Sequence, residues 1–177
     1  MAEASFGASD LEAVVPRLRR YARALTGNRD AADDLTQDTL ERAWSKRVLW
    51  QPGTDLRAWM FTVMHNVFVN GTRRSRPTVS LDDLGVDDVG AATSTSVETG
   101  VVLAELARAL SLLPEEQREV LLLVGLEQFS YAEASEVLGV PMGTVMSRLS
   151  RARERLRILM EAGTAGADRP APLRRVK

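Results

Sequence analysis

The sequence predicts an all-α fold of two small helical domains joined by a flexible acidic linker. Apolar residues recur at the three- and four-residue spacing of amphipathic helices in both halves of the chain. Between the halves, residues 78–102 carry five acidic and no basic side chains. Their richness in Asp, Gly, Ala, Ser and Thr, without a strong period, is typical of a linker. Residues 1–77 have a net charge of +3 and residues 103–177 of +1.

The first helix is predicted over residues 11–25, where apolar side chains repeat at helical spacing. Pro16 must kink this helix or mark a restart, because proline lacks the N–H that a helix interior uses. Gly27 and Asn28 end it. A second helix is predicted from about Arg29 or Asp30 to Lys46. Its expected core side consists of Ala32, Leu35, Leu40, Ala43 and Trp44.

Another face of the second helix carries a polar stripe with four carboxylates. The stripe consists of Asp33, Asp34, Gln37, Asp38 and Glu41. Two interpretations stay open at this point. The stripe is either a solvated face or a surface for a basic partner, which would relieve the mild repulsion between its carboxylates.

The third helix is predicted to begin near Thr54 or Asp55, after a turn over residues 51–54. It is apolar on most of its circumference, so we expect it to be the central helix of its domain. Three arginines close it: Arg73, Arg74 and Arg76. They suit a helix C-terminus, and they also form a cluster that could bind phosphates.

Residues 130–159 have the layout of a helix-turn-helix. Ser130 and Glu133 form a capping box, Gly139 suits a helix C-cap, and Pro141 suits the first position of the next helix. The buried stripe of that next helix is expected to be Val145, Leu149, Ala152, Leu156 and Leu159. Its other side carries hydroxyls and arginines, the groups that read the major groove and bind phosphates. The alternative is a solvated basic face on an ordinary helix.

The composition excludes several classes of function. The chain has no cysteine, so it has no disulfide and no thiolate site. His65 is its only histidine and is expected to be a packed or surface residue. No motif of a catalytic or phosphate-binding site is present, so neither an enzyme nor a cofactor is expected. No segment has the apolar length of a membrane span, and a cytoplasmic protein without membrane insertion is expected.

The chain resembles bacterial RNA polymerase sigma factors of the sigma-70 family, extracytoplasmic-function (ECF, group IV) type. Residues 33–44 resemble the core-binding helix of region 2, and Gln51–Arg57 with Ala58-Trp59-Met60 resemble its promoter-melting loop and helix. Residues 113–120 and the helix-turn-helix resemble region 4. The resemblance covers about residues 9–160. It implies region 2 at residues 9–77, the acidic linker at 78–102, region 4 at 103–160 and a disordered basic tail at 161–177.

The resemblance also implies roles for particular residues. The polar stripe would bind the clamp coiled coil of core RNA polymerase. The minus-10 promoter DNA would contact Gln51, Pro52, Gly53, Thr54, Asp55, Arg57, Arg73, Arg74 and Arg76. The minus-35 element would contact Thr144, Ser147, Arg148, Ser150, Arg151 and Arg155. Met146 stands where the family commonly has a basic residue. An anti-sigma factor is a further implied partner, and a stress or signal response an implied setting.

A second hypothesis is a stand-alone helix-turn-helix transcriptional regulator whose N-terminal helices form a ligand-binding or dimerisation domain. A ligand domain is expected to contain a pocket with polar groups. A melting domain instead needs an exposed loop beside a basic surface.

Overall fold

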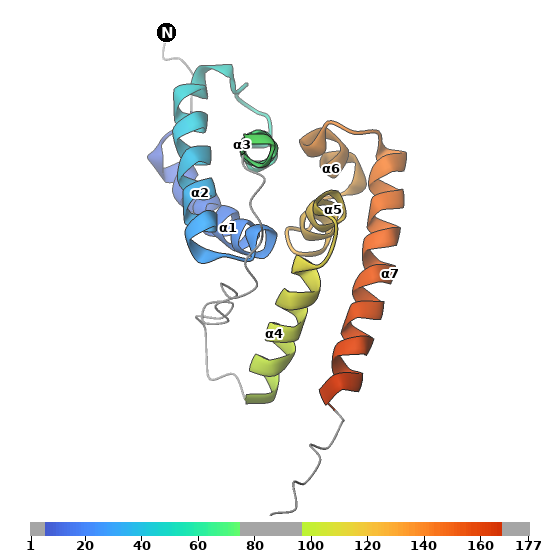
Figure 1. The fold of residues 1–177 in the computed structure, drawn as a ribbon. Coiled ribbons are helices and arrows are strands. Elements are labelled where there is room, and N and C mark those ends of the chain that lie inside the picture. Colours follow the sequence, from blue (N-terminus) through green and yellow to red (C-terminus); the bar gives the residue numbers. More distant parts are fainter. Residues whose placement is uncertain (1–5, 75–96, 168–177) are drawn as a thin grey trace, which may run out of the picture.

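The computed structural model describes residues 6–74 and 97–167, and every regular element within these ranges is helical (Figure 1). Most of the predicted linker and the end of the predicted tail lie outside them. The elements are α1 (Ala8–Thr26), α2 (Arg29–Ser45), a short 3-10 helix η1 (Arg47–Leu49), α3 (Leu56–Arg74), α4 (Val97–Ser111), α5 (Glu115–Gly125), α6 (Tyr131–Leu138) and α7 (Met142–Ala167). None of the described helices is long and apolar enough to cross a membrane.

Helix α1 runs through Pro16 as one helix, so the restart, one of the two predicted outcomes, does not occur. Its inner face buries Val14, Leu18 and Leu25, and this packing holds the helix together around the missing N–H. Gly27 ends the helix in the left-handed conformation, with φ of 68°. The predicted end of the first helix is therefore confirmed.

Helix α2 begins after Asn28, whose side chain accepts a hydrogen bond from the Ala31 N–H at 2.9 Å. Trp44 was expected in the core but is 47% exposed, so that prediction is wrong. Thr36 and Thr39 are buried in its place. Each donates its hydroxyl proton to the carbonyl four residues earlier, at 2.7 Å, which explains how polar side chains enter the core.

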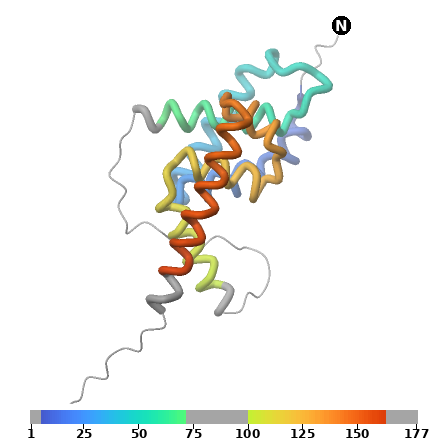
Figure 2. Tube along the Cα trace, turned by 90° about the vertical axis from the view of Figure 1, so that its right-hand side faces the viewer, coloured from blue at the N-terminus to red at the C-terminus, as the bar shows by residue number. Residues whose placement is uncertain are grey.

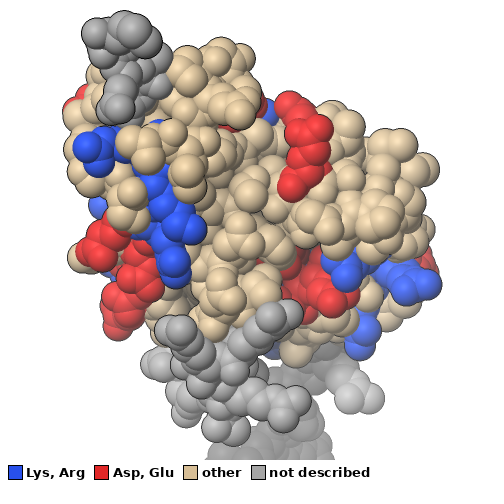
Figure 3. All heavy atoms as spheres, turned by 90° about the horizontal axis from the view of Figure 1, so that it is seen from above, with Lys and Arg blue, Asp and Glu red and all other residues tan. Residues whose placement is uncertain are grey.

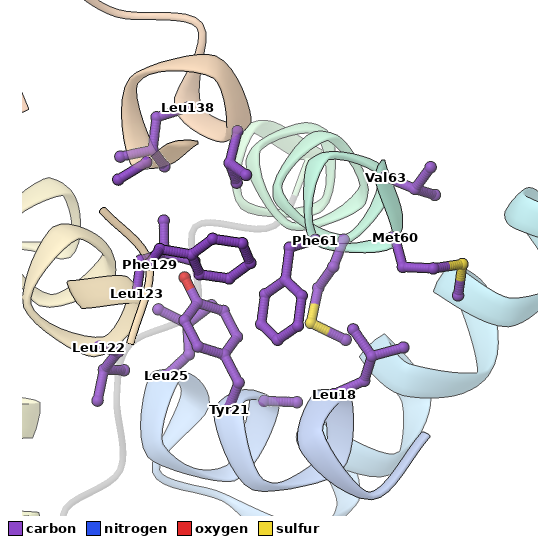
Figure 4. Packing of buried hydrophobic residues seen from close by; sticks show 14 of the residues in the cluster. Leu18, Tyr21, Leu25, Met60, Phe61, Val63, Leu122, Leu123, Phe129 and Leu138 are labelled. Carbon is purple, nitrogen blue, oxygen red and sulfur yellow. The ribbon is translucent and has the colours of Figure 1, made fainter. Parts of the chain in front are cut away.

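Helix α3 is the centre of the molecule. It contacts α1 and α2 on one side and α6 on the other. Its fully buried residues are Met60, Phe61 and Met64. Phe61 lies among side chains of both halves of the chain, next to Tyr21 and Phe129 (Figure 4). The helix is apolar on most of its circumference because it packs against α1 and α2 on one side and against α6 on the other.

The second half begins earlier than predicted. Helix α4 starts at Val97, inside the predicted linker, and the helix contacts α7 and α1. At the other end, α7 continues to Ala167, into the predicted tail. Figure 2 shows α7 crossing the front of the other helices.

The two halves pack against each other. Helix α3 contacts α6, and α1 contacts α4 and α5. One hydrophobic core contains buried residues from both halves, including Leu18 of α1, Phe61 of α3, Leu123 of α5 and Phe129 of the α5–α6 turn. Below, this packing of the two halves is called the closed arrangement. The sequence pattern indicated two helical units but did not predict that they pack together.

Candidate functional site

The polar stripe of α2 faces solvent. Asp33, Asp34, Gln37, Asp38 and Glu41 are all exposed, while Ala32, Leu35 and Ala43 hold the opposite face in the core. Within the stripe, the Gln37 amide donates a hydrogen bond to the Glu41 carboxylate at 3.2 Å. The stripe thus presents four carboxylates to any partner that approaches α2.

An apolar groove lies beside this stripe, between α1 and α2. It is lined by Ala8, Leu11, Glu12, Val15, Pro16, Leu40, Glu41 and Trp44. Glu41 belongs both to the groove and to the stripe, so the two form a continuous surface. The exposure of Trp44, which was expected in the core, is explained by its place in this groove.

The predicted promoter-melting loop projects from the molecule. Residues 51–55 are all exposed, and Gly53 has φ of 89°, a conformation that favours glycine. Thr54 closes the turn by donating its hydroxyl proton to the Gln51 carbonyl at 2.7 Å. Asp55 accepts a hydrogen bond from the Arg57 N–H at 2.8 Å and caps α3, so this helix starts one or two residues later than predicted.

Arg57 is held by the other half of the chain. Its guanidinium lies 4.1 Å from the ring centroid of Phe129 and donates to the Glu127 carbonyl at 3.3 Å. It also lies 3.6 Å from the Asp55 carboxylate and 3.8 Å from the Glu133 carboxylate. Of the other predicted minus-10 residues, Arg73 and Arg74 belong to α3 but their side chains are not described, and Arg76 lies outside the described residues.

The helix-turn-helix forms as predicted. The Ser130 hydroxyl accepts from the Glu133 N–H at 3.2 Å, and the Glu133 carboxylate accepts from the Ser130 N–H at 2.7 Å. These hydrogen bonds hold the pKa of Glu133 below its usual value, with a smaller contribution from Arg57. Gly139 is left-handed with φ of 62°. Ala134, Val137 and Leu138 form the buried face of α6, whereas Ala132 is exposed.

Helix α7 buries Val145, Leu149 and Ala152, while Leu156 and Leu159 are half-buried, which confirms the predicted stripe. Pro141 precedes the helix and does not begin it, because its carbonyl accepts from the N–H groups of the first turn. Among the predicted minus-35 residues, Ser147, Ser150, Arg151 and Arg155 are exposed and Thr144 and Arg148 are half-buried.

Arg148 is engaged within the protein. Its guanidinium lies 2.7 Å from the Glu116 carboxylate of α5. A shallow groove on the neighbouring face of α7 is lined by Tyr131, Met146, Leu149, Ser150, Arg153, Glu154 and Arg157. Figure 3, which views the molecule from above, shows small separate patches of both charges on this face, with uncharged surface between them.

Glu127, in the α5–α6 turn, is a functional candidate that the sequence analysis missed. Its carboxylate is fully buried and accepts from Arg17 at 2.9 Å and from Arg20 at 2.7 Å. A signal existed: Glu127 is the only charged residue in the largely apolar stretch 120–129, and a carboxylate buried there requires a partner.

His65 packs between the halves, in agreement with the expected packed role. Its Nδ1 lies 2.7 Å from the buried Glu119 carboxylate of α5. Among the described residues, no three His, Cys, Asp or Glu side chains lie together in a way that could hold a metal ion.

Both halves match known families. Residues 11–65 match the model described as the Sigma2 domain of PhyR, and residues 103–156 match Sigma-70, region 4. The chain is 41% identical over 152 residues to ECF RNA polymerase sigma factor EcfG of Rhodopseudomonas palustris (strain TIE-1), covering 85% of this chain and 83% of that protein.

Two solved structures extend the similarity to the fold. The sigma factor RpoE of Bartonella quintana, co-crystallised with the anti-sigma factor NepR, aligns with a TM-score of 0.71 and 32% identity over 91% of this chain and 97% of that one. CnrH, solved with the cytosolic domain of CnrY, aligns with a TM-score of 0.64 and 27% identity over 88% and 90% of the two chains. With both sigma regions matched in order, and with a relative of this identity and coverage, the chain belongs to the ECF RNA polymerase sigma factors.

Proposed function

We propose that this chain binds core RNA polymerase through the exposed face of α2 and directs it to promoters that α7 and the 51–55 loop recognise. The observation that carries this proposal is the position of the stripe: four carboxylates face solvent on the helix that resembles the core-binding helix of the family. Sigma factors are initiation factors and not catalysts, so the chain contributes recognition and the polymerase supplies the chemistry in the cytoplasm.

The polymerase-binding surface extends beyond the carboxylates. A basic helix of the clamp would pair with Asp34 and Asp38, and its apolar side chains would enter the groove beside Trp44. Burial of apolar area supplies affinity, whereas exposed ion pairs mainly supply orientation and association rate. The two features together suit an amphipathic basic partner better than either does alone.

The promoter-binding surfaces lie on different halves of the chain. Helix α7 offers Ser147, Ser150 and Arg151 to base edges, because these side chains are exposed near its N-terminal part. Arg155, further along, would contact phosphates. The exposed 51–55 loop is placed to receive a base drawn out of the duplex, which requires a protruding loop beside the DNA.

An anti-sigma factor is proposed as a regulatory partner. RpoE, which shares this fold, was solved in complex with the anti-sigma factor NepR, and CnrH with the cytosolic domain of CnrY. The stand-alone regulator hypothesis is not favoured, because relatives in sequence and in structure span both halves of this chain.

The test is reconstitution with purified core RNA polymerase. The chain is expected to co-elute with core enzyme and to support run-off transcription from a template carrying a cognate promoter, selected from a genomic fragment library. Core enzyme alone on the same template is the control. A chain that binds the selected DNA but never associates with core enzyme would restore the stand-alone regulator.

A further inference from the structure

Glu127 is a carboxylate at the interface between the two halves of the chain, with no exposed surface. Arg17 Nε donates to its Oε2 at 2.9 Å, and Arg20 donates to its Oε1 through Nε at 3.1 Å and through Nη2 at 2.7 Å. The main-chain carbonyls of the same turn accept further hydrogen bonds. Arg17 and Arg57 donate to the Glu127 carbonyl at 3.2 and 3.3 Å, and Arg20 donates to the Leu126 carbonyl at 3.5 Å.

Arg17, Arg20 and Arg57 are called the arginine cluster below. Two come from α1 and one from the start of α3, so the first half of the chain builds the cluster and the second half provides the anion. A guanidinium presents donors in a planar fork that fits a carboxylate and a phosphate equally well. The cluster therefore has the donor set of a phosphate site, with a carboxylate and two carbonyls at its acceptor positions.

The cluster adjoins the DNA path of the proposed function. Arg57 directly follows the exposed 51–55 loop, and its side chain reaches back to the same turn that holds Glu127. Asp55 and Glu133, the other carboxylates near Arg57, lie 3.6 and 3.8 Å away, beyond hydrogen-bond distance. Glu127 is thus the main anion that the cluster binds in the closed arrangement.

The closed arrangement is too small to span a promoter. A compact chain of this length has a radius of gyration of about 16 Å. The minus-35 and minus-10 elements are separated by roughly 25 base pairs, or about 85 Å of duplex. Since α3 contacts α6, the two halves must separate before both elements are bound, and separation removes Glu127 from the arginine cluster.

We propose that the arginine cluster is a binding site for a phosphate of promoter DNA, and that Glu127 occupies this site in the closed chain. The proposal rests on the proposed function. It adds Arg17 and Arg20 of α1 to the DNA-binding residues, and it makes Glu127 an internal competitor of DNA. A carboxylate at this position suppresses binding of the free chain to DNA until another interaction opens it.

The first experiment measures promoter binding by the reconstituted holoenzyme at several salt concentrations. The Arg17→Gln/Arg20→Gln double variant is expected to bind on the order of tenfold more weakly, because it loses charge-assisted hydrogen bonds. Its log–log salt slope should fall by about one unit for the lost phosphate contact. Arg17→Lys/Arg20→Lys keeps both charges and should retain the slope. An unchanged slope in the Gln variant would overturn the phosphate site.

The second experiment uses the free chain and a labelled promoter duplex. Glu127→Gln is expected to raise affinity on the order of tenfold and to steepen the salt slope by about one unit. The matched control is Glu119→Gln, which alters a buried carboxylate of the same interface that pairs with His65. An equal gain in the control would show that loosening of the interface alone raises DNA affinity. It would overturn the proposal that Glu127 competes with DNA for the arginine cluster.

A third measurement links the two residues. In the Arg17→Gln/Arg20→Gln background, Glu127→Gln should give no gain in DNA affinity, because the freed site no longer exists. A gain that persists there would contradict the proposal. Circular dichroism establishes that each variant is folded. If the wild-type chain fails to bind core enzyme, the proposed function fails; if it binds and transcribes but the arginine variants behave as wild type, this inference alone fails.

Discussion

Phe61 of α3 and Phe129 of the α5–α6 turn pack edge to face, with ring centroids 5.2 Å apart and planes at 70°. Tyr21 of α1 also packs edge to face against Phe61, with ring centroids 5.1 Å apart. The aromatic contact thus runs from the first half of the chain into the second. It is the apolar counterpart of the bonds between Glu127 and the arginine cluster.

Phe61→Ala should destabilise the chain more than Phe129→Ala. Removal of a buried aromatic side chain costs about 3–5 kcal/mol. Phe61 packs against two rings, Tyr21 of its own half and Phe129 of the other half, and the contact with Tyr21 does not depend on the interface. Urea denaturation would give the two free energies of unfolding. Equal losses of unfolding free energy in the two variants, with unchanged overall dimensions by small-angle scattering, would contradict this prediction.

Charge reversal on α2 should weaken binding to core polymerase without unfolding the chain. Asp34→Arg and Asp38→Arg change exposed side chains, so the fold is expected to persist. Glu136→Arg on α6 makes the same change of charge at an exposed position away from the stripe. Binding to immobilised core enzyme is the measurement. Wild-type affinity in the Asp34→Arg/Asp38→Arg double variant would remove the clamp assignment.

Arginines of α7 should separate into base-reading and phosphate-binding roles. Arg151→Ala should cost about 1–3 kcal/mol and relax base preference in the minus-35 element. Arg155→Ala should weaken binding to all sequences alike and lower the salt slope by about one unit. Arg153→Ala is the matched control, because Arg153 is exposed but lines the groove beside Tyr131. Full discrimination in Arg151→Ala would refute the base contact.

The exposed loop should be needed for melting and dispensable for folding. Replacement of residues 51–54 by Gly-Ser leaves Asp55 in place to cap α3. Binding to the minus-35 element should persist, while permanganate reactivity of thymines near the start site should disappear. Reactivity equal to that of the wild type would mean that the loop has no part in opening the duplex.

The capping box of α6 should make this helix sensitive to acid. Because the folded-state pKa of Glu133 is lowered, its stabilising contribution is present above the ordinary Glu pKa and is lost as pH falls through the lowered value. Carboxyl chemical shifts should report that lowered midpoint. In Ser130→Ala the midpoint should move up, and helix stability should fall by about 1 kcal/mol. A midpoint unaffected by Ser130→Ala would show that the box does not set it.

Local signals in the sequence were sufficient for the end of α1, the start of α2 and both ends of α6. Asn28, Gly27, Gly139 and the Ser130–Glu133 pair act through neighbouring backbone groups, so a single sequence contains their whole cause. The prediction that Trp44 lies in the core was wrong because helical spacing indicates which face of a helix is buried but not how wide the buried stripe is. The core position of Thr39 was missed because a hydroxyl that bonds within its own helix cannot be distinguished from a solvated one by spacing.

The contact between the halves could not be predicted in the same way. The partners of Glu127 are about a hundred residues away in the chain, and no period connects them. The apolar circumference of α3 predicts a central helix of the first domain, but it does not predict that the helix also packs against the second domain. Its second face covers α6, and a single carboxylate within an apolar stretch was the remaining sign of this interface.

The closed arrangement also sets how tightly the free chain can associate with polymerase. If only separated chains are competent, the measured dissociation constant equals the intrinsic one divided by the competent fraction. Interface residues such as Phe129, which lie outside the α2 surface, then determine the fraction of chains that is separated. Substitutions that loosen their packing would increase apparent affinity for core enzyme although they touch no part of it. The stability of the contact between the two halves would therefore influence how well this chain competes with other sigma factors for a limited pool of core enzyme.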